Sequence, residues 1–231
     1  MLNIYNKSRT EEKMTDYLEI NNVIHFYGGK KILDKMFLNC KTGDILGLLG
    51  RNGCGKSTLL KIIFGSLKAK SKNIIINSKN YEKPFINKNY IAYMPQNTFL
   101  PGDLSLKKAI KLMANRNNAR EILADQRIIS LKNSKISALS GGEQRYLEFM
   151  LIMHLDTKFV MLDEPFSQID PIYTKRMKEI IKTNAKTKGI IITDHDYYNV
   201  LDVSNRNILM REGIGIEIKD EKDLKKYGYL A

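Results

Sequence analysis

A glycine-rich loop, set between an apolar run and an amphipathic segment, constrains the possible fold of this chain more than any other feature. The loop spans residues 50–58 and reads GRNGCGKST. The preceding run DILGLLG is typical of a strand buried on both faces, and the following STLLKIIFG predicts a helix. Glycines let the backbone turn so that successive N–H groups point at phosphate oxygens, and the helix N-terminus adds partial positive charge. The complete spacing therefore predicts a phosphate-binding loop, which we name the glycine-rich loop.

The rest of the chain alternates predicted strands with predicted helices. Strand patterns lie at residues 17–26, 32–40, 73–76, 90–93, 159–165, 189–196, 205–210 and 215–218, and helix patterns at 106–133, 141–155 and 171–185. Such alternation predicts an α/β fold with a twisted, mostly parallel sheet and helices on its faces. Residues 1–13 are polar and charged, so we expect a flexible tail followed by a single domain, 14–231.

An acidic strand end supplies a second motif, FVMLDEP at residues 159–165. Asp163 suits the support of Mg²⁺, and Glu164 can polarise an attacking water as a general base. In the glycine-rich loop, Lys56 can reach the β- and γ-phosphates and Ser57 can ligate Mg²⁺. The acidic motif is weak alone, but together with the loop it indicates a nucleotide-hydrolysing enzyme.

The segment LSGGEQR, residues 139–145, opens another predicted helix. Its residues Ser140, Gly141 and Gly142 form a second glycine-containing loop, with a hydroxyl as an added donor. One chain therefore carries two helix termini that suit phosphate, which distinguishes it from a simple nucleotide switch. We name residues 139–145 the signature segment.

The amino-acid composition limits which partners the chain could bind and which cellular compartment it could occupy. The formal net charge of +13 suits nucleic acid or an anionic membrane surface. The lysines are scattered, however, and arginine is scarce, so we expect solvated lysines on every face and no specific nucleic-acid partner. The two cysteines, Cys40 and Cys54, show no metal-ligand spacing and favour a reducing compartment. No run approaches the roughly 18 to 20 apolar residues of a membrane span, and no apolar signal region opens the chain, so we expect a cytoplasmic protein.

With these motifs the sequence resembles the ATP-binding cassette (ABC) family over nearly the whole chain after Met14. The matching motifs stand in the family's order: Tyr27 before a glycine turn, the glycine-rich loop, Gln96 in MPQ, the signature segment, the acidic strand end, SQID at residues 167–170, and His195 in TDHD. This set excludes small GTPases, kinases and helicases. The resemblance implies a phosphate-loop NTPase core with a mostly parallel sheet, an N-terminal antiparallel β subdomain, and a helical subdomain inserted at roughly 97–155.

The resemblance also implies a role for each matching residue. ATP would be bound by Tyr27, Gly50, Arg51, Asn52, Gly53, Cys54, Gly55, Lys56, Ser57, Thr58, Gln96, Ser140, Gly141, Gly142, Glu143 and Asp170. Mg²⁺ would be held by Ser57, Gln96 and Asp163. Catalysis would rest on Glu164, which activates water, on Lys56, and on His195, which contacts the γ-phosphate. Two copies would face each other head to tail, so that each ATP lies between the glycine-rich loop of one and the signature segment of the other.

Several positions leave alternatives or depart from the family. His25 and Phe26 compete with Tyr27 for stacking on adenine, and we choose Tyr27 by its distance from the turn. Cys54 lies among inward-pointing amides, so we expect a stabilised thiolate that is sensitive to alkylation, the alternative being a small side chain that faces away. Glu143 replaces the usual glutamine, a familiar variant, and Gln168 is expected to alter packing between the two copies.

The function implied is that of the ATP-hydrolysing subunit of a transporter, which dimerises around two ATP and acts through separate transmembrane permease subunits. The chain would then lie at the inner face of the cell membrane, and it resembles compact cassettes such as those of lipopolysaccharide export or branched-chain amino-acid uptake. Phe99 and Leu100 would either grip a permease helix or pack the helical lobe. The alternatives are a soluble ABC ATPase of iron–sulfur cluster assembly and a ribosome-associated ABC protein.

Overall fold

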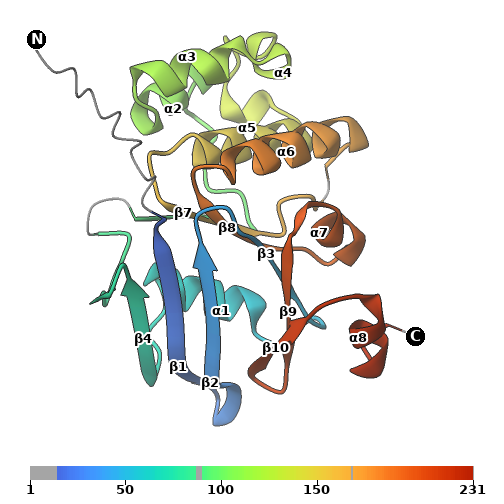
Figure 1. The fold of residues 1–231 in the computed structure, drawn as a ribbon. Helices are drawn as coiled ribbons and strands as arrows, with labels where there is room; N and C mark the ends of the chain where they lie inside the picture. The colour runs from blue at the N-terminus through green and yellow to red at the C-terminus, as the bar shows by residue number, and fades with distance from the viewer. Residues whose placement is uncertain (1–14, 87–89, 168, 231) are drawn as a thin grey trace, which may run out of the picture.

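The computed structural model describes residues 15–86, 90–167 and 169–230. The predicted tail, residues 1–13, and Gln168 lie outside the described residues. Within them the chain forms two β-sheets, of four and six strands, with a layer of helices packed above them in Figure 1. This arrangement confirms the predicted α/β class with one antiparallel and one mostly parallel sheet.

The smaller sheet is antiparallel, in the order β2–β1–β4–β5. Its strands are β1 (Tyr17–Tyr27), β2 (Lys30–Lys41), β4 (Ser71–Ile76) and β5 (Lys79–Asn80). Strands β1 and β2 form a hairpin through Gly28 and Gly29, whose φ angles of 52° and 83° suit a two-residue turn that favours glycine. Leu18 and Ile20 alternate with more exposed neighbours, as expected of a sheet with one buried face.

The larger sheet has the order β10–β9–β3–β8–β7–β6. Its strands are β3 (Ile45–Leu49), β6 (Ile91–Met94), β7 (Phe159–Asp163), β8 (Gly189–Thr193), β9 (Arg206–Arg211) and β10 (Ile214–Ile218). All neighbours are parallel except β10, which pairs with β9 in the antiparallel sense. Because ligands of parallel sheets bind at the carboxyl ends of the strands, the loops after β3, β6, β7 and β8 are placed to form a site.

Helices pack on both faces of the larger sheet, and those that lie between β6 and β8 in the chain form the upper layer of Figure 1. Their bounds are α1 (Lys56–Phe64), α2 (Leu106–Met113), α3 (Arg116–Ala124), α4 (Gln126–Ile129), η1 (Ile136–Ala138), α5 (Gly141–Met153), α6 (Pro171–Asn184), α7 (Tyr197–Val203) and α8 (Glu221–Lys226). Helices α2, α3 and α4 follow β6 in the chain and lie above α5 and α6. Helices α7 and α8 are short and were not predicted from the sequence.

The apolar runs of β3, β7 and β8 are continuous because these strands are buried on both faces. Along β7, Val160 and Leu162 pack in the core beneath α5 and α6, whereas Phe159 and Met161 pack in the core shared with α1 and the antiparallel sheet. All five residues of each strand are buried. The sheet therefore holds the loops at its carboxyl edge on a rigid support.

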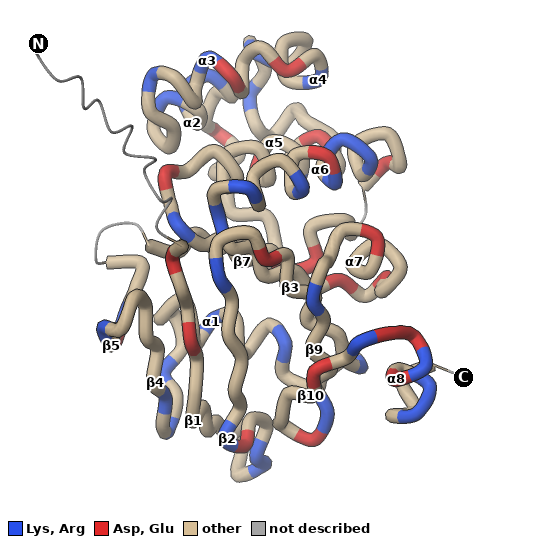
Figure 2. The backbone as a smooth tube through the Cα atoms, viewed as in Figure 1, with Lys and Arg blue, Asp and Glu red and all other residues tan. Residues whose placement is uncertain are grey.

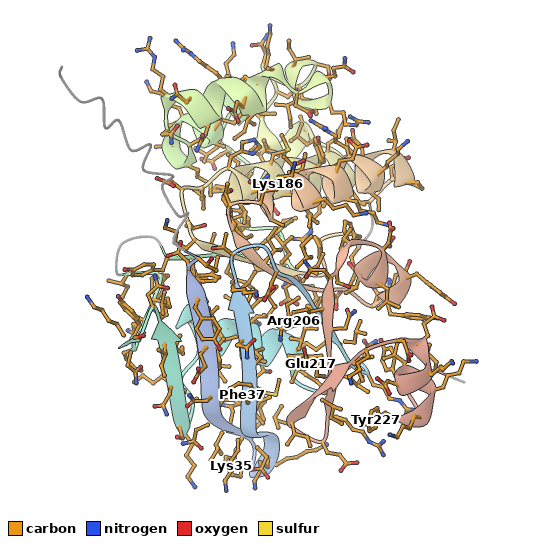
Figure 3. All side chains as sticks on the ribbon, viewed as in Figure 1. Lys35, Phe37, Lys186, Arg206, Glu217 and Tyr227 are labelled. Carbon is orange, nitrogen blue, oxygen red and sulfur yellow. The ribbon has the colours of Figure 1, made fainter. Side chains whose placement is uncertain are left out.

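Charges are spread over the surface rather than gathered in one block. Figure 2 shows Lys and Arg on both the helical layer and the sheets, with Asp and Glu among them. Arg206 on β9 illustrates the local pairing, with Asp44 at 2.8 Å and Glu217 on β10 at 3.2 Å (Figure 3). Over the described ranges, no helix combines the length and the apolar character that crossing a membrane requires.

Candidate nucleotide site

A cleft of about 560 Å³ opens at the carboxyl ends of the parallel strands. It is lined by Tyr27, Ile32, Asn52, Gly53, Gly55, Lys56, Ser57, Thr58, Gln96, Glu164 and His195. These residues come from the loops after β3, β6, β7 and β8, from the first turn of α1, from the end of β1 and from β2. The structure thus brings together, in one place, residues that the sequence separates by more than 160 positions.

The glycine-rich loop wraps around the start of α1. Gly53 and Gly55 have φ angles of 78° and 107°, a region that favours glycine, and a Cβ at Gly55 would lie 2.9 Å from the Ile32 side chain. Lys56 is only 7% exposed, and its Nζ donates to the carbonyl of Gly50 at 2.7 Å. The ammonium and the first N–H groups of α1 are therefore donors that suit a phosphate chain.

Asp163 ends β7 and is held by two hydroxyl groups. Ser57 Oγ donates to Oδ1 at 2.9 Å, and Tyr93 Oη donates to Oδ2 at 2.8 Å. Burial raises the pKa of this carboxyl, while the two hydrogen bonds act in the opposite direction. Tyr93 was not predicted as a site residue, although its place two residues before Pro95 puts it on the strand that carries Gln96 into the cleft.

The donor set in this corner fits Mg²⁺. The Ser57 hydroxyl, the Asp163 carboxylate and the nearby Gln96 amide are oxygen ligands of the kind that Mg²⁺ prefers. Among the described residues no group of three or more His, Cys, Asp and Glu side chains could hold a metal ion by itself. That sparse set agrees with the usual binding of Mg²⁺ through one or two carboxylates together with substrate phosphates and water.

Glu164 follows Asp163 in a strained backbone conformation. Its φ of 51° is unusual for a residue other than glycine and costs on the order of 1–3 kcal/mol, and such strain is often found at functional positions. Its Oε2 accepts hydrogen bonds from Gln96 Nε2 at 2.8 Å and from Ser167 Oγ at 3.3 Å. Ser167 Oγ also lies 3.1 Å from His195 Nδ1, so one hydroxyl links the predicted base to the predicted sensor of phosphate.

His195 follows β8 and is oriented by a buried neighbour. Its Nδ1 lies 3.2 Å from Asp194 Oδ1, and the histidine side chain is 57% exposed. Asp194 in turn accepts the backbone N–H groups of Phe166 and Asp196, and burial raises its pKa. The orientation of the His195 ring therefore depends on the loop after β7 as well as on Asp194, which precedes it in the chain.

Two buried charges on α5, which sequence reasoning missed, connect the signature helix to the rest of the site. Arg145 donates to the carbonyls of Pro95, Asp163 and Glu164 at 2.6, 2.8 and 3.0 Å.

Glu148, fully buried, accepts the backbone N–H groups of Phe99 at 2.8 Å and Leu100 at 3.1 Å. We name residues 95–100 the glutamine segment, which α5 thus holds at both ends. Charged residues at i and i+3 within the apolar face of α5 were the available signal.

Phe99 and Leu100 themselves face the protein interior. Leu100 is 9% exposed, and Phe99 is partly buried against the same core. Of the two interpretations left open by the sequence, the structure favours packing of the lobe. The glutamine segment is held by that packing and by Glu148.

The signature segment caps α5 and does not line the cleft of its own chain. Ser140 Oγ accepts the N–H of Glu143 at 3.3 Å, while Glu143 Oε2 accepts the N–H of Ser140 at 2.8 Å. This reciprocal pair is a capping box, for which glutamate is as suitable as glutamine. Asp170 likewise caps a helix of its own chain, because its Oδ1 accepts the N–H of Ile172 at the start of α6.

Among the three aromatic candidates near the first turn, the geometry favours Tyr27. Tyr27 lines the cleft and is 51% exposed. His25 is buried and packs edge-on against Tyr27 with 4.7 Å between ring centroids. The Phe26 ring lies beneath Lys70 instead. Tyr27 is thus the aromatic side chain that a nucleotide in the cleft could meet.

The expectation of a stabilised thiolate at Cys54 is wrong. Its sulfur lies on the outer side of the loop, and with Arg51 it lines a separate pocket beside β9. Burial raises the pKa of the Cys54 thiol more than Lys56 and the backbone N–H groups lower it. The Arg51 side chain also points away from the cleft, because its Nη2 donates to the carbonyl of Gly228 at 2.8 Å. Only the backbone of these two residues can therefore face a nucleotide in the cleft.

Comparison with known proteins agrees with this geometry. Residues 33–167 match the sequence profile of the family described as "ABC transporter". The spermidine/putrescine import ATP-binding protein PotA of Mycoplasma mycoides subsp. mycoides SC is 33% identical over 208 residues, which is 85% of this chain and 59% of that protein. The lipopolysaccharide export system ATP-binding protein LptB of Haemophilus influenzae is 30% identical over 211 residues, covering 85% and 87% of the two chains.

Solved structures show the same fold. An ATP-binding subunit of an ABC transporter superposes with a TM-score of 0.81 at 21% identity, over 91% of this chain and 93% of that one. A nucleotide-free ATP-binding cassette superposes with a TM-score of 0.77 at 21% identity, over 93% and 96%. The profile match and the two relatives together show that this chain belongs to the ABC transporter ATP-binding family.

Proposed function

We propose that this chain is the ATP-hydrolysing subunit of a membrane transporter and that it works as a pair of cassettes. The observation that carries the proposal is the meeting of Lys56, Ser57, Gln96, Glu164 and His195 in one cleft. Family membership implies ATPase activity in general. The glycine-rich loop supplies the donors for the phosphates, and Tyr27 supplies an aromatic face for the base.

The chemistry follows from where each side chain lies. Lys56 and the amides of the loop neutralise and orient the phosphates. Ser57, Gln96 and Asp163 would hold Mg²⁺, which spreads the charge of the phosphoryl group when bound. Glu164, positioned by Gln96 and Ser167, accepts the proton of the attacking water. His195 is linked to the same base through Ser167, so it is placed to respond to the loss of the γ-phosphate.

The location of the signature segment supports a dimer. Ser140, Gly141, Gly142 and Glu143 form a helix N-terminus that suits an anion, yet none of them lines the cleft of its own chain. A second copy in a head-to-tail arrangement would bring its signature segment to each cleft, and two-fold symmetry would complete two equivalent sites. ATP would favour the closed pair, and hydrolysis would let it open.

Transport is the proposed use of the ATP. The two relatives are named for spermidine/putrescine import and for lipopolysaccharide export. These names support transmembrane permease subunits as partners and a location at the inner face of the membrane. The helical subdomain, residues 97–155, would be the part nearest to the permease. The comparisons do not favour the cluster-assembly and ribosomal alternatives.

The proposal is tested with Glu164→Gln in the presence of ATP and Mg²⁺. The variant keeps the donors of the glycine-rich loop but loses the base, so we expect a long-lived dimer by light scattering. Lys56→Ala, which removes the phosphate donor, serves as the control and should neither bind ATP nor dimerise. A monomer of Glu164→Gln at saturating ATP would count against the paired mechanism. Co-purification of the wild-type chain with a permease from detergent-solubilised membranes tests the transporter assignment separately.

A further inference from the structure

The last helix, α8, and residues 227–230 pack behind the glycine-rich loop, on the side opposite to the cleft. Figure 3 labels Tyr227 in this region, beside β9 and β10. A pocket of about 570 Å³ lies between this C-terminal segment and the glycine-rich loop. It is lined by residues that include Arg51, Cys54, Met210, Arg211, Tyr227 and Tyr229. The loop thus has two faces, one toward the nucleotide site and one toward the C-terminal helix.

The end of α8 is shaped by a left-handed glycine. Gly228 has a φ of 65°, its N–H donates to the carbonyl of Lys225 at 2.9 Å, and the N–H of Tyr229 donates to the carbonyl of Leu224 at 2.9 Å. This pair of bonds is a Schellman cap. The cap turns the carbonyls of Tyr227 and Gly228 outward, where they can accept other donors.

Those two carbonyls are taken by arginines from different parts of the chain. Arg51 Nη2, from the glycine-rich loop, donates to the carbonyl of Gly228 at 2.8 Å. Arg211 Nη1, from the end of β9, donates to the carbonyl of Tyr227 at 3.0 Å. Both bonds have a charged donor, which strengthens them, although solvent at this exposed site screens part of that gain. Leu224 is fully buried, which anchors the helix that carries the cap.

The glycine-rich loop is also tightly packed at its first residue, Gly50. A Cβ added at Gly50 would lie 2.6 Å from Cys54 Sγ and 2.9 Å from the carbonyl of Met210. Tyr229 lines the same pocket as Arg51 and Cys54, and burial there raises the pKa of its hydroxyl more than the N–H of Gly50 lowers it. The loop therefore rests against β9 and the C-terminal segment, with Arg51 as its polar link to α8.

We propose that Arg51, Arg211 and the cap of α8 form a latch that holds the glycine-rich loop in the geometry that binds phosphate. This inference rests on the proposed binding of ATP. Arg51 is a positioning residue in this arrangement, because it acts on the loop through α8. A loop rich in glycine is costly to order, so holding it in place before the nucleotide arrives raises affinity. Glu164, Gln96 and His195 lie on other loops, so the latch governs nucleotide affinity more than the rate of hydrolysis.

The test compares Arg51→Ala, Arg211→Ala and the double variant, with the dissociation constant for ATP measured by calorimetry alongside KM and kcat. We expect each single variant to weaken ATP binding by about tenfold, with kcat at saturating ATP nearly unchanged. The double variant should be little worse than either single one, because both arginines act through one cap. Arg116→Ala, which removes an exposed arginine of α3, is the control for loss of charge and should bind as the wild type does.

Arg211 makes the test decisive because it lies outside the glycine-rich loop and the ATP cleft. If Arg51→Ala weakens binding and Arg211→Ala does not, the latch is wrong, and the role of Arg51 is local to its loop. If neither variant changes the dissociation constant, the latch is equally wrong. Arg211→Met removes the guanidinium donor but keeps an unbranched side chain, and it serves as a second variant should Arg211→Ala unfold. It should show faster amide hydrogen exchange at residues 50–56 than the wild type, and unchanged exchange overturns the proposal. A wild-type chain that fails to bind ATP would instead refute the proposed function.

Discussion

Gln96 Nε2 donates a hydrogen bond of 2.8 Å to Glu164 Oε2, joining the loops that follow the neighbouring strands β6 and β7. The predicted Mg²⁺ ligand and the predicted general base are therefore in direct contact. Ser167 shares the same carboxylate oxygen and reaches His195. The orientation of Glu164 depends on these two polar neighbours, and its function can be examined through each.

The first prediction concerns this orientation. Ser167→Ala removes the hydroxyl that joins Glu164 to His195, so we expect kcat for ATP hydrolysis to fall by about tenfold with little change in KM. Loss of the base itself, in Glu164→Gln, should lower kcat by about 10²- to 10⁴-fold. Steady-state phosphate release measures both effects, with Ser137→Ala in η1 as a matched control. Unchanged kcat in Ser167→Ala would show that the hydroxyl does not help to orient the base.

The second prediction concerns Tyr93, whose hydroxyl donates to Asp163. Tyr93→Phe removes that bond from a carboxylate whose pKa burial already raises, so the pKa should rise further. Because Mg²⁺ requires the ionised carboxylate, the Mg²⁺ concentration for half-maximal ATPase activity should increase by about tenfold, and more so at acidic pH. Titration with Mg²⁺ at two pH values measures this. Tyr90→Phe, which alters a hydroxyl near Tyr81, is the control, and equal Mg²⁺ dependence in the two variants contradicts the role of Tyr93.

The third prediction concerns the buried Glu148. Glu148→Leu leaves the N–H groups of Phe99 and Leu100 without their acceptor, which costs about 1–3 kcal/mol for each buried unpaired group. Glu148→Gln keeps an acceptor oxygen in the same place and should lose less. Urea unfolding of the two variants measures the difference in the free energy of unfolding. Equal losses would mean that these backbone bonds do not stabilise the glutamine segment.

The fourth prediction concerns Lys188, whose Nζ donates to the carbonyls of Met153 and Leu155 at 2.6 and 2.7 Å. Burial lowers the pKa of this ammonium to about 8. The unfolded chain, with a pKa of about 10.4, binds more protons between these two values, so the free energy of unfolding should rise with pH in that window. The variant Lys188→Met lacks this titrating group. The difference in the free energy of unfolding between the wild type and this variant therefore cancels the contributions of the other titratable groups.

Urea unfolding of the wild type and Lys188→Met at about pH 7.5 and about pH 10 measures the fourth prediction. The stability of the wild type relative to the variant should be greater at the higher pH. A relative stability that stays constant or falls would show that the folded chain does not lower the pKa of Lys188.

Much of the architecture follows from local patterns. The glycines at positions 53 and 55 require left-handed backbone angles, and the structure has them. The apolar run before the loop and the run ending in Asp163 are buried strands, as predicted, because residues that pack on both faces must all be apolar. The capping box at Ser140 could likewise be expected from Glu143 three residues later.

The contacts between distant side chains could not be read in this way. Arg51 meets Gly228 across 177 positions, Tyr93 meets Asp163 across 70, and Glu148 meets Phe99 across 49. Cys54 was misjudged because a loop pattern does not say which face of the loop a side chain takes. The order of the strands and the packing of the helices determine which distant side chains meet and which way a loop side chain faces.

The sequence by itself determined the long strands, the glycine-rich loop and the starts of the main helices, because glycine angles, apolar periodicity and caps act within a few residues. Only the tertiary structure decided that Gln96 reaches Glu164, that Tyr93 supports Asp163, and that α8 lies behind the glycine-rich loop. The physical reason is that a side-chain contact depends on distances of a few ångströms, which the order of strands in the sheet and the packing of both its faces establish.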